Sequence, residues 1–239
     1  MRKIRRITVS LMFAGVVSFG FWACSQDEGI ETSQTTEDIE SNSIKSTSSN
    51  KPVIEDEGDR LFSEYVSSVE FATYYNAIEE FNTNLNNRKT ISDFESDEEM
   101  FTWIGNNISA TRFTKVDNAI IDWNEIGSLS VQLETKFPKV TDFYRTKSKL
   151  IVGEKIDKWF VWGMGLDFTT TLGSCADDLI GCRKSASDAY AESAHELVAL
   201  ADEGQDMEVI RKKNIAMSTY QEAIKSCIEQ YHNCNGTNN

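Results

Sequence analysis

Four cysteines with matching spacing are the residues of this sequence best suited to covalent chemistry. Cys175 and Cys182 lie seven positions apart, and Cys227 and Cys234 repeat that interval. Four thiols can bind zinc or form two disulfides, but zinc-binding cysteines are typically separated by only about two to four residues. The wider spacing favours disulfides, for which four cysteines allow three pairings.

Other residues with catalytic or metal-binding chemistry do not complete a known arrangement. His195 begins a stretch like a zinc-protease helix, but Ala199 stands where the second histidine ligand belongs. Residues 93–104 begin like a calcium-binding loop, yet Glu98 replaces its glycine and Ile104 its bidentate Glu. No serine lies in a Gly-x-Ser-x-Gly turn. We therefore name no catalytic residue, no metal ligand and no cofactor.

The fifth cysteine, Cys24, ends an apolar stretch near the start of the chain. Residues 2–6 contain four basic side chains and residues 7–22 are largely apolar, which is typical of a secretory signal peptide. The border Phe21-Trp22-Ala23-Cys24 resembles the lipobox of bacterial lipoproteins, although the usual Leu is absent. The resemblance implies that residues 1–23 are removed and that a diacylglycerol on Cys24 binds the chain to a membrane. An ordinary signal peptide cleaved nearby is the alternative.

The residues directly after Cys24 indicate which membrane receives the lipid. Ser25 stands where Asp would resemble the inner-membrane retention signal of Gram-negative lipoproteins. Gln26-Asp27-Glu28 resembles the short acidic signals by which certain Gram-negative lineages export lipoproteins to the cell surface. The resemblance implies attachment to the outer membrane, on its periplasmic or extracellular face. A solvated acidic tether is the alternative interpretation of these residues.

The charge of the chain restricts its partners. The net charge is −14, and because the first 23 residues carry four basic and no acidic side chains, the mature chain has a net charge of −18. Nucleic-acid binding requires a basic surface, so we expect no nucleic-acid partner. Anionic lipid head groups are repelled as well, and the expected membrane contact is the lipid on Cys24. The sequence does not identify a protein partner.

The chain after Cys24 divides into a tether and a domain. Residues 25–60 are rich in Ser, Thr, Asp, Glu and Asn and have few large apolar side chains. Such a segment cannot bury enough apolar surface to offset its ordering entropy, so we expect residues 24–60 to be a disordered acidic linker. A short edge strand at Val53-Ile54 is the alternative. Residues 61–239 are long enough to form one domain with its own core.

The apolar pattern of the domain predicts an all-α fold. Apolar residues recur at three and four positions from 61 to 85, which predicts one amphipathic helix. Ser96 followed by Glu99 forms a capping pattern that predicts a second helix start. A third pattern begins at Val116 and is expected to end near Phe137, because Pro138 disfavours helical backbone in the residue before it.

Two further helices are expected at residues 171–203 and 207–234, and together they select the disulfide pairing. Cysteines seven positions apart on one helix are about 10.5 Å apart, whereas bridged Cα atoms lie within about 7 Å. Facing residues of an antiparallel hairpin have position numbers with a constant sum. Cys175–Cys234 and Cys182–Cys227 both give 409, which places the turn near Gly204. In the oxidising compartment that export implies, we expect these two bridges to staple residues 171–234.

An aromatic segment at residues 159–168 is the one candidate for a ligand site. Trp159 and Trp162 offer apolar surface for a groove, and Gly163 and Gly165 allow close approach of a backbone. A buried core segment bent by its glycines is the favoured interpretation, and the groove is the alternative.

The sequence indicates no reaction, and an enzyme is the less favoured class. The favoured interpretation is a non-enzymatic binding or structural lipoprotein of the outer membrane. The alternatives are a surface enzyme or small-ligand carrier with a site at residues 159–168, and an accessory or immunity factor for an exported protein.

Overall fold

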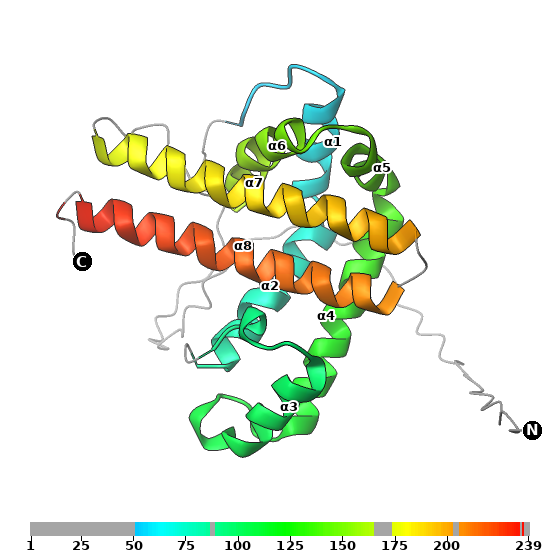
Figure 1. The fold of residues 1–239 in the computed structure, drawn as a ribbon, viewed down its shortest axis with the longest axis vertical. Helices are drawn as coiled ribbons and strands as arrows, with labels where there is room; N and C mark the ends of the chain where they lie inside the picture. Colours follow the sequence, from blue (N-terminus) through cyan, green and yellow to red (C-terminus); the bar gives the residue numbers. More distant parts are fainter. Residues whose placement is uncertain (1–50, 87–88, 165–173, 203–205, 235, 237–239) are drawn as a thin grey trace, which may run out of the picture. The chain divides into compact units, whose positions relative to one another are not determined.

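The computed structural model describes residues 51–86, 89–164, 174–202, 206–234 and 236, and their regular structure is entirely helical (Figure 1). The α-helices are α1 (Glu57–Val66), α2 (Val69–Asn84), α3 (Asp97–Asn106), α4 (Val116–Lys136), α5 (Pro138–Thr146), α6 (Lys149–Gly163), α7 (Ser174–Asp202) and α8 (Asp206–Cys234). Two short 3-10 turns, η1 (Ile91–Asp93) and η2 (Ile108–Ala110), flank α3. The predicted all-α class is confirmed.

The start of the domain differs from the sequence prediction in two ways. Helix α1 begins at Glu57, four residues before the expected border, because Asp56 caps it by accepting a hydrogen bond from the backbone N–H of Asp59 at 2.8 Å. Residues 57–60 are therefore not part of the linker, and residues 51–55 form neither helix nor strand. The single helix expected over 61–85 is also wrong: Ser68 caps a new helix, α2, through the N–H of Phe71. Residues 24–50 of the expected linker lie outside the described residues.

Local signals fixed the other predicted boundaries correctly. Ser96 accepts a hydrogen bond from the N–H of Glu99 at 3.1 Å and caps α3. Helix α4 ends at Lys136, and Pro138 occupies the first position of α5, where its missing N–H leaves no intrahelical bond unmade. Ser148 caps α6, a helix for which no boundary was predicted, in the same manner as Ser96 caps α3.

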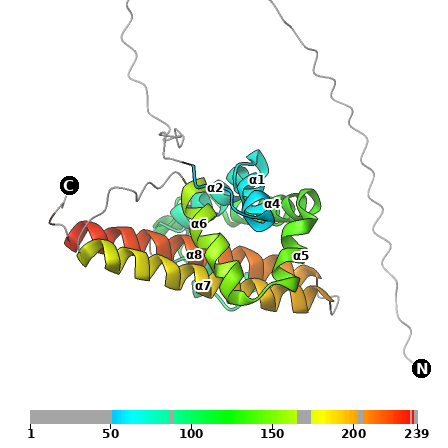
Figure 2. The same ribbon diagram turned by 90° about the horizontal axis from the view of Figure 1, so that it is seen from above.

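The predicted hairpin and both of its bridges are confirmed. Helices α7 and α8 lie side by side along their length in both views (Figures 1 and 2), and α7 also packs against α6. Cys175 bonds to Cys234 and Cys182 to Cys227, with Cα atoms 5.8 and 5.7 Å apart. The expected turn at Gly204 lies outside the described residues.

Aromatic rings join the hairpin to the first half of the domain. Phe160 of α6 is fully buried, and its ring centroid lies 5.2 Å from that of Phe71 in α2. The same ring lies 5.5 Å from Tyr190 in α7 and 5.8 Å from Tyr220 in α8. A single side chain of the aromatic segment therefore connects α2, α6, α7 and α8 in one core.

Candidate functional site

The described part of the aromatic segment is largely buried core, which is the interpretation that the sequence favours over a ligand groove. Trp159 is 0% exposed, and its indole N–H donates to the carboxylate of Asp59 at 2.8 Å. Trp162 is half-buried and packs edge-on against Trp159. A Cβ at Gly163 would lie 2.8 Å from Cβ of Val66, so this glycine lets α6 pack against α1 and not against a ligand. The alternative of a ligand groove has no support at Trp159, Trp162 and Gly163, and Gly165 lies outside the described residues.

The carboxylate of Asp59 is the most completely bonded acid of the described chain, and it joins α1 to α6. Oδ1 accepts from the Nζ of Lys155 at 2.9 Å as well as from Trp159, and Oδ2 accepts from the Nζ of Lys158 at 2.8 Å and from the backbone N–H of Glu55 at 2.9 Å. An ionised carboxylate has about four acceptor positions. All of them are used by this set of contacts, which we call the Asp59 cluster.

These contacts determine the protonation state of Asp59. Burial by itself raises the pKa of this carboxyl, but the hydrogen bonds from Lys158, Trp159 and Lys155 outweigh burial and hold the pKa well below its usual range. Asp59 therefore stays ionised at neutral pH and cannot act there as a general acid. The cluster is a structural contact between two helices.

In the acidic segment that begins like a calcium-binding loop, Asp97 also makes structural hydrogen bonds to other helices. Oδ2 of Asp97 accepts from the indole N–H of Trp123 at 3.0 Å, and Oδ1 accepts from Nε of Arg211 at 3.0 Å. Asp97 thus connects α3 to α4 and α8. Among the described residues, no group of three or more His, Cys, Asp or Glu side chains is arranged to hold a metal ion.

A cavity of about 550 Å³ lies among α4, α5, α7 and α8. The residues that line this four-helix cavity include the last turns of α7 and the first turns of α8. This end of the hairpin lies next to α4 and α5 in Figure 1. Its volume falls within the range of roughly 300–1,000 Å³ that is usual for small-molecule sites. Its apolar lining comes from Val131, Pro138, Ala194, Leu197, Val198, Ala201, Val209 and Ile210, and its polar lining from Glu134, Thr135, Thr141, Asp142, Tyr144, Tyr190, Asp206 and Lys213.

One ion pair marks the polar wall of the four-helix cavity. Lys213 is only 7% exposed, and its Nζ lies 2.8 Å from Oε1 of Glu134, whose side chain is 39% exposed. Burial lowers the pKa of Lys213, while the charge of Glu134 acts in the opposite direction. A buried lysine is retained at a cost unless it has such a partner. The positive charge of Lys213 and the negative charge of Glu134 therefore cancel, and the cavity lining contains a polar pair without net charge.

Two tyrosines add neutral hydroxyls to the same wall. Burial raises the pKa of Tyr144 well above its usual value, and the charge of Glu134 adds to the effect. Burial and Glu134 raise the pKa of Tyr190 in the same direction. Both phenols therefore remain protonated donors. The Tyr144 Oη is buried, and it meets no hydrogen-bond partner among the described residues.

The acidic rim of the four-helix cavity is partly neutralised. Arg145 donates to Asp142 at 2.8 Å and to Asp202 at 2.9 Å, which connects α5 to the last residue of α7. Asp206, the first residue of α8, also lines the cavity. Ligands that approach this rim therefore meet carboxylates before they meet Lys213.

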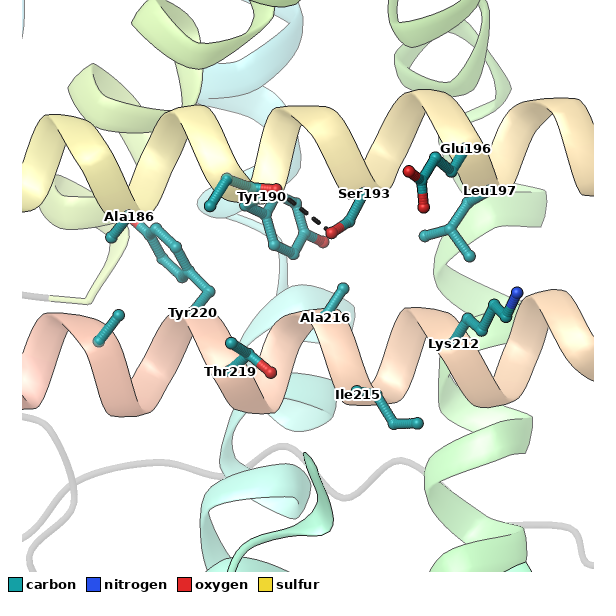
Figure 3. A pocket seen from close by; sticks show the side chains of 12 residues that line it. Ala186, Tyr190, Ser193, Glu196, Leu197, Lys212, Ile215, Ala216, Thr219 and Tyr220 are labelled. Carbon is teal, nitrogen blue, oxygen red and sulfur yellow. Dashed lines mark hydrogen bonds between the residues drawn. The ribbon is translucent and has the colours of Figure 1, made fainter. Parts of the chain in front are cut away.

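A second hollow of about 230 Å³ lies between α7 and α8 (Figure 3). The predicted register places Ala186 opposite Ala223 and Ala189 opposite Tyr220, and all four residues line this hollow. Small side chains on both helices leave the space, while Leu197 and Lys212 face each other near its other end (Figure 3). The volume is below the usual range for ligand sites, so we regard the hollow as a packing feature of the hairpin.

Comparisons with known proteins give no match: no family model, no curated protein and no solved structure is similar to this chain. None of the helices in the described ranges is long and apolar enough to cross a membrane.

The sequence prediction missed every polar residue of the four-helix cavity, although one signal was present. Ile210 and Met217 belong to the apolar stripe of α8, and Lys213 lies three positions after the first and four before the second. A lysine at that position is expected on the buried face of the helix. Its partner Glu134 has no comparable signal, because it is 79 positions away on α4, where acidic residues usually face solvent.

Proposed function

We propose that this protein is a non-enzymatic, lipid-anchored binding protein of the outer membrane, and that its helical domain holds a small, largely apolar molecule. The observation that carries the binding role is the four-helix cavity, whose lining combines apolar side chains with an ion pair on a buried lysine and a hydroxyl without a partner among the described residues. A site with mostly apolar lining and a few polar groups is the usual form of a small-molecule site.

Binding is better supported than catalysis by the states of the ionisable groups. The acid with the most strongly lowered pKa, Asp59, uses all its acceptor positions within the protein. In the cavity, Lys213 is paired with Glu134, and the two tyrosines stay protonated. The carboxylate of Glu134, the base that lies next to Lys213, is bound to its ammonium as an ion pair, and this arrangement favours binding over nucleophilic catalysis.

The anchor rests on the sequence at the N-terminus. The basic start, the apolar stretch and the Ala23-Cys24 border support export and acylation of Cys24. Two or more acyl chains make membrane attachment durable without a protein segment in the bilayer. Gln26-Asp27-Glu28 supports an outer-membrane position exposed at the cell surface.

Mass spectrometry of the mature N-terminus tests the anchor. We expect a peptide that begins at Cys24 and carries the mass of acyl chains, and we expect Cys24→Ala to leave the membrane fraction or to remain an uncleaved precursor. A mature N-terminus without acyl mass would contradict the lipoprotein assignment.

Binding of an uncharged fluorescent amphiphile, prodan, tests the cavity. The mature protein is placed in phosphatidylcholine nanodiscs, and prodan emission is compared with two variants of α4. Val131 is an exposed residue of the cavity lining, so Val131→Trp should fill the entrance and lower prodan affinity by about tenfold. Ile121 is exposed on the same helix outside the cavity, and Ile121→Trp should bind as the wild type does. Equal prodan signals from all three proteins would overturn the proposal.

A further inference from the structure

We infer that the four-helix cavity selects an uncharged amphiphile: a molecule with an apolar tail and a head that presents a hydroxyl or carbonyl oxygen. This inference rests on the proposed binding function and specifies its ligand class.

The lining includes a set of apolar side chains that suit the tail of such a molecule. Leu197, Val198 and Ala201 of α7 face the cavity together with Val209 and Ile210 of α8. These side chains offer only hydrocarbon surface, and each buried CH₂ of a ligand gains about 0.8 kcal/mol by leaving water. The apolar residues therefore suit an aliphatic or alicyclic tail.

The ion pair argues against a charged head. Lys213 and Glu134 lie 2.8 Å apart and already neutralise each other. An acid that accepted a hydrogen bond from Lys213 would place its negative charge close to Glu134, which already binds this ammonium, and on the same lining as Asp206. An ammonium head would meet the buried charge of Lys213 itself. The mature chain, with a net charge of −18, also repels anions at long range.

The hydrogen-bond donors at the polar wall call for an acceptor. An ammonium has three N–H groups, and one oxygen of Glu134 can occupy only part of them. The Tyr144 hydroxyl is a further donor, and Glu134 acts electrostatically on this phenol as well as on Lys213. An oxygen atom of an alcohol, ester or ketone is an acceptor that suits these donors, and it leaves the ion pair intact.

A series of ligands with one tail and three heads tests this inference. The probes are decanol, decanoate and decylammonium, and the readout is the midpoint of thermal unfolding in nanodiscs, followed by far-ultraviolet circular dichroism. Since a ligand that binds only the folded state raises the midpoint, decanol should raise it by about 5 °C at saturating concentration, and the two ions by much less. The same measurement on Val131→Trp in nanodiscs gives the midpoint shift that the probes cause by partitioning into the lipid.

Removal of one hydroxyl tests the polar wall without a change in the ion pair. Tyr144→Phe should weaken decanol about fivefold, the usual effect of one lost hydrogen bond, as derived from the concentration dependence of the midpoint. Tyr75→Phe removes a phenol hydroxyl of α2 outside the cavity and should leave decanol affinity unchanged.

The outcomes separate the ligand class from the binding function. A shift with decanoate or decylammonium that equals or exceeds the shift with decanol would overturn the uncharged class and leave the cavity as a binding site. Unchanged decanol affinity in Tyr144→Phe would overturn the assignment of the polar wall. If none of the three probes, and not prodan either, distinguishes the wild type from Val131→Trp, the binding function itself fails.

Discussion

At the scale of single residues, Asp59 shows how far a local sequence can mislead. It lies in a run of acidic residues that is typical of a solvated linker, yet it is 0% exposed. The spacing of Lys155, Lys158 and Trp159 places these three side chains on one face of a helix, which the sequence does reveal. Asp59 is about a hundred positions away from this helix face in the sequence, and no local pattern predicts that the two are in contact.

Substitution of Asp59 should be costly. Asp59→Asn keeps the shape but removes the charge that Lys155 and Lys158 bind, and breaking a buried ion pair typically costs about 3 kcal/mol of unfolding free energy. Urea unfolding measures the loss. The control is Asp142→Asn, which breaks an exposed ion pair with Arg145 and should change stability by less than about 0.5 kcal/mol. A loss below that of the control would contradict the structural role of the Asp59 cluster.

The lowered pKa of Asp59 predicts that the wild type and Asp59→Asn respond differently to acid. The pKa of Asp59 in the folded protein lies below its ordinary value of 3.8, so its contribution is complete above that value and disappears as the pH falls toward the folded pKa. The difference in unfolding free energy between wild type and Asp59→Asn should therefore be constant near neutral pH and should shrink below about pH 4. A difference that grew with acidification would have the wrong sign for a carboxylate that is stabilised in the folded state.

At the scale of helices, boundaries that depend on local chemistry were predictable. Ser96 and Pro138 define the ends of α3 and α4 through capping and through the missing N–H of proline. The break between α1 and α2 was not predictable, because apolar residues continue at helical spacing on both sides of Ser68. The hairpin pairing could be derived because four cysteines in one register leave a single solution on two antiparallel helices.

Two glycines on different helices should respond to alanine in opposite directions. Gly163→Ala places a Cβ 2.8 Å from Cβ of Val66, which forces α1 and α6 apart and should cost about 1–3 kcal/mol. Gly181 lies within α7 with no atom close to the added Cβ, so Gly181→Ala should stabilise by about 1 kcal/mol through helix propensity. Thermal or urea unfolding of the two variants gives both signs, and the same sign for both would contradict the packing of α1 on α6.

The two disulfides should not contribute additively. The Cys182–Cys227 bridge closes a loop of 45 positions, which lies inside the loop of 59 positions closed by Cys175–Cys234. Once either disulfide has formed, the other closes only the short stretches of chain that lie between the two bridges. In the chain-entropy treatment, removal of either bridge costs about 3 kcal/mol, and removal of both costs about 7 kcal/mol. Paired Cys→Ser variants, unfolded without reductant, measure the three values. A double loss smaller than the sum of the single losses would contradict this treatment.

At the scale of the whole molecule, the helical class and the stapled hairpin could be derived from the sequence, but the four-helix cavity could not. The cavity depends on how α4 and α5 approach the hairpin, and this packing brings Glu134 next to Lys213. The aromatic segment drew attention because large apolar residues are frequent in ligand sites. In this domain the large apolar side chain of Phe160 is instead part of the buried core.

The proposed surface position makes a prediction for the complete chain. Replacing Asp27 and Glu28 by Asn and Gln removes the acidic residues next to Cys24 and leaves the helical domain unchanged. We expect less digestion by protease added to intact cells, with an unchanged amount of protein in total membranes. Exchange of Glu31 and Asp38 for their amides is a control that removes the same charge at a greater distance from Cys24. Equal digestion of wild type and the first variant would exclude the export signal.

The Asp59 cluster also has a mechanical consequence. The chain enters the domain through residues 51–56, directly before Asp59, so a pulling force transmitted from the N-terminal side reaches this cluster before it reaches the core. Its hydrogen bonds to Glu55, Lys155 and Lys158 then carry the load, and their rupture would release α1 from α6. The hairpin cannot lengthen under the same force, because covalent bonds close it at two places. Under tension, the domain would therefore yield from its N-terminal helix, while the stapled helices that form half of the cavity wall would remain paired.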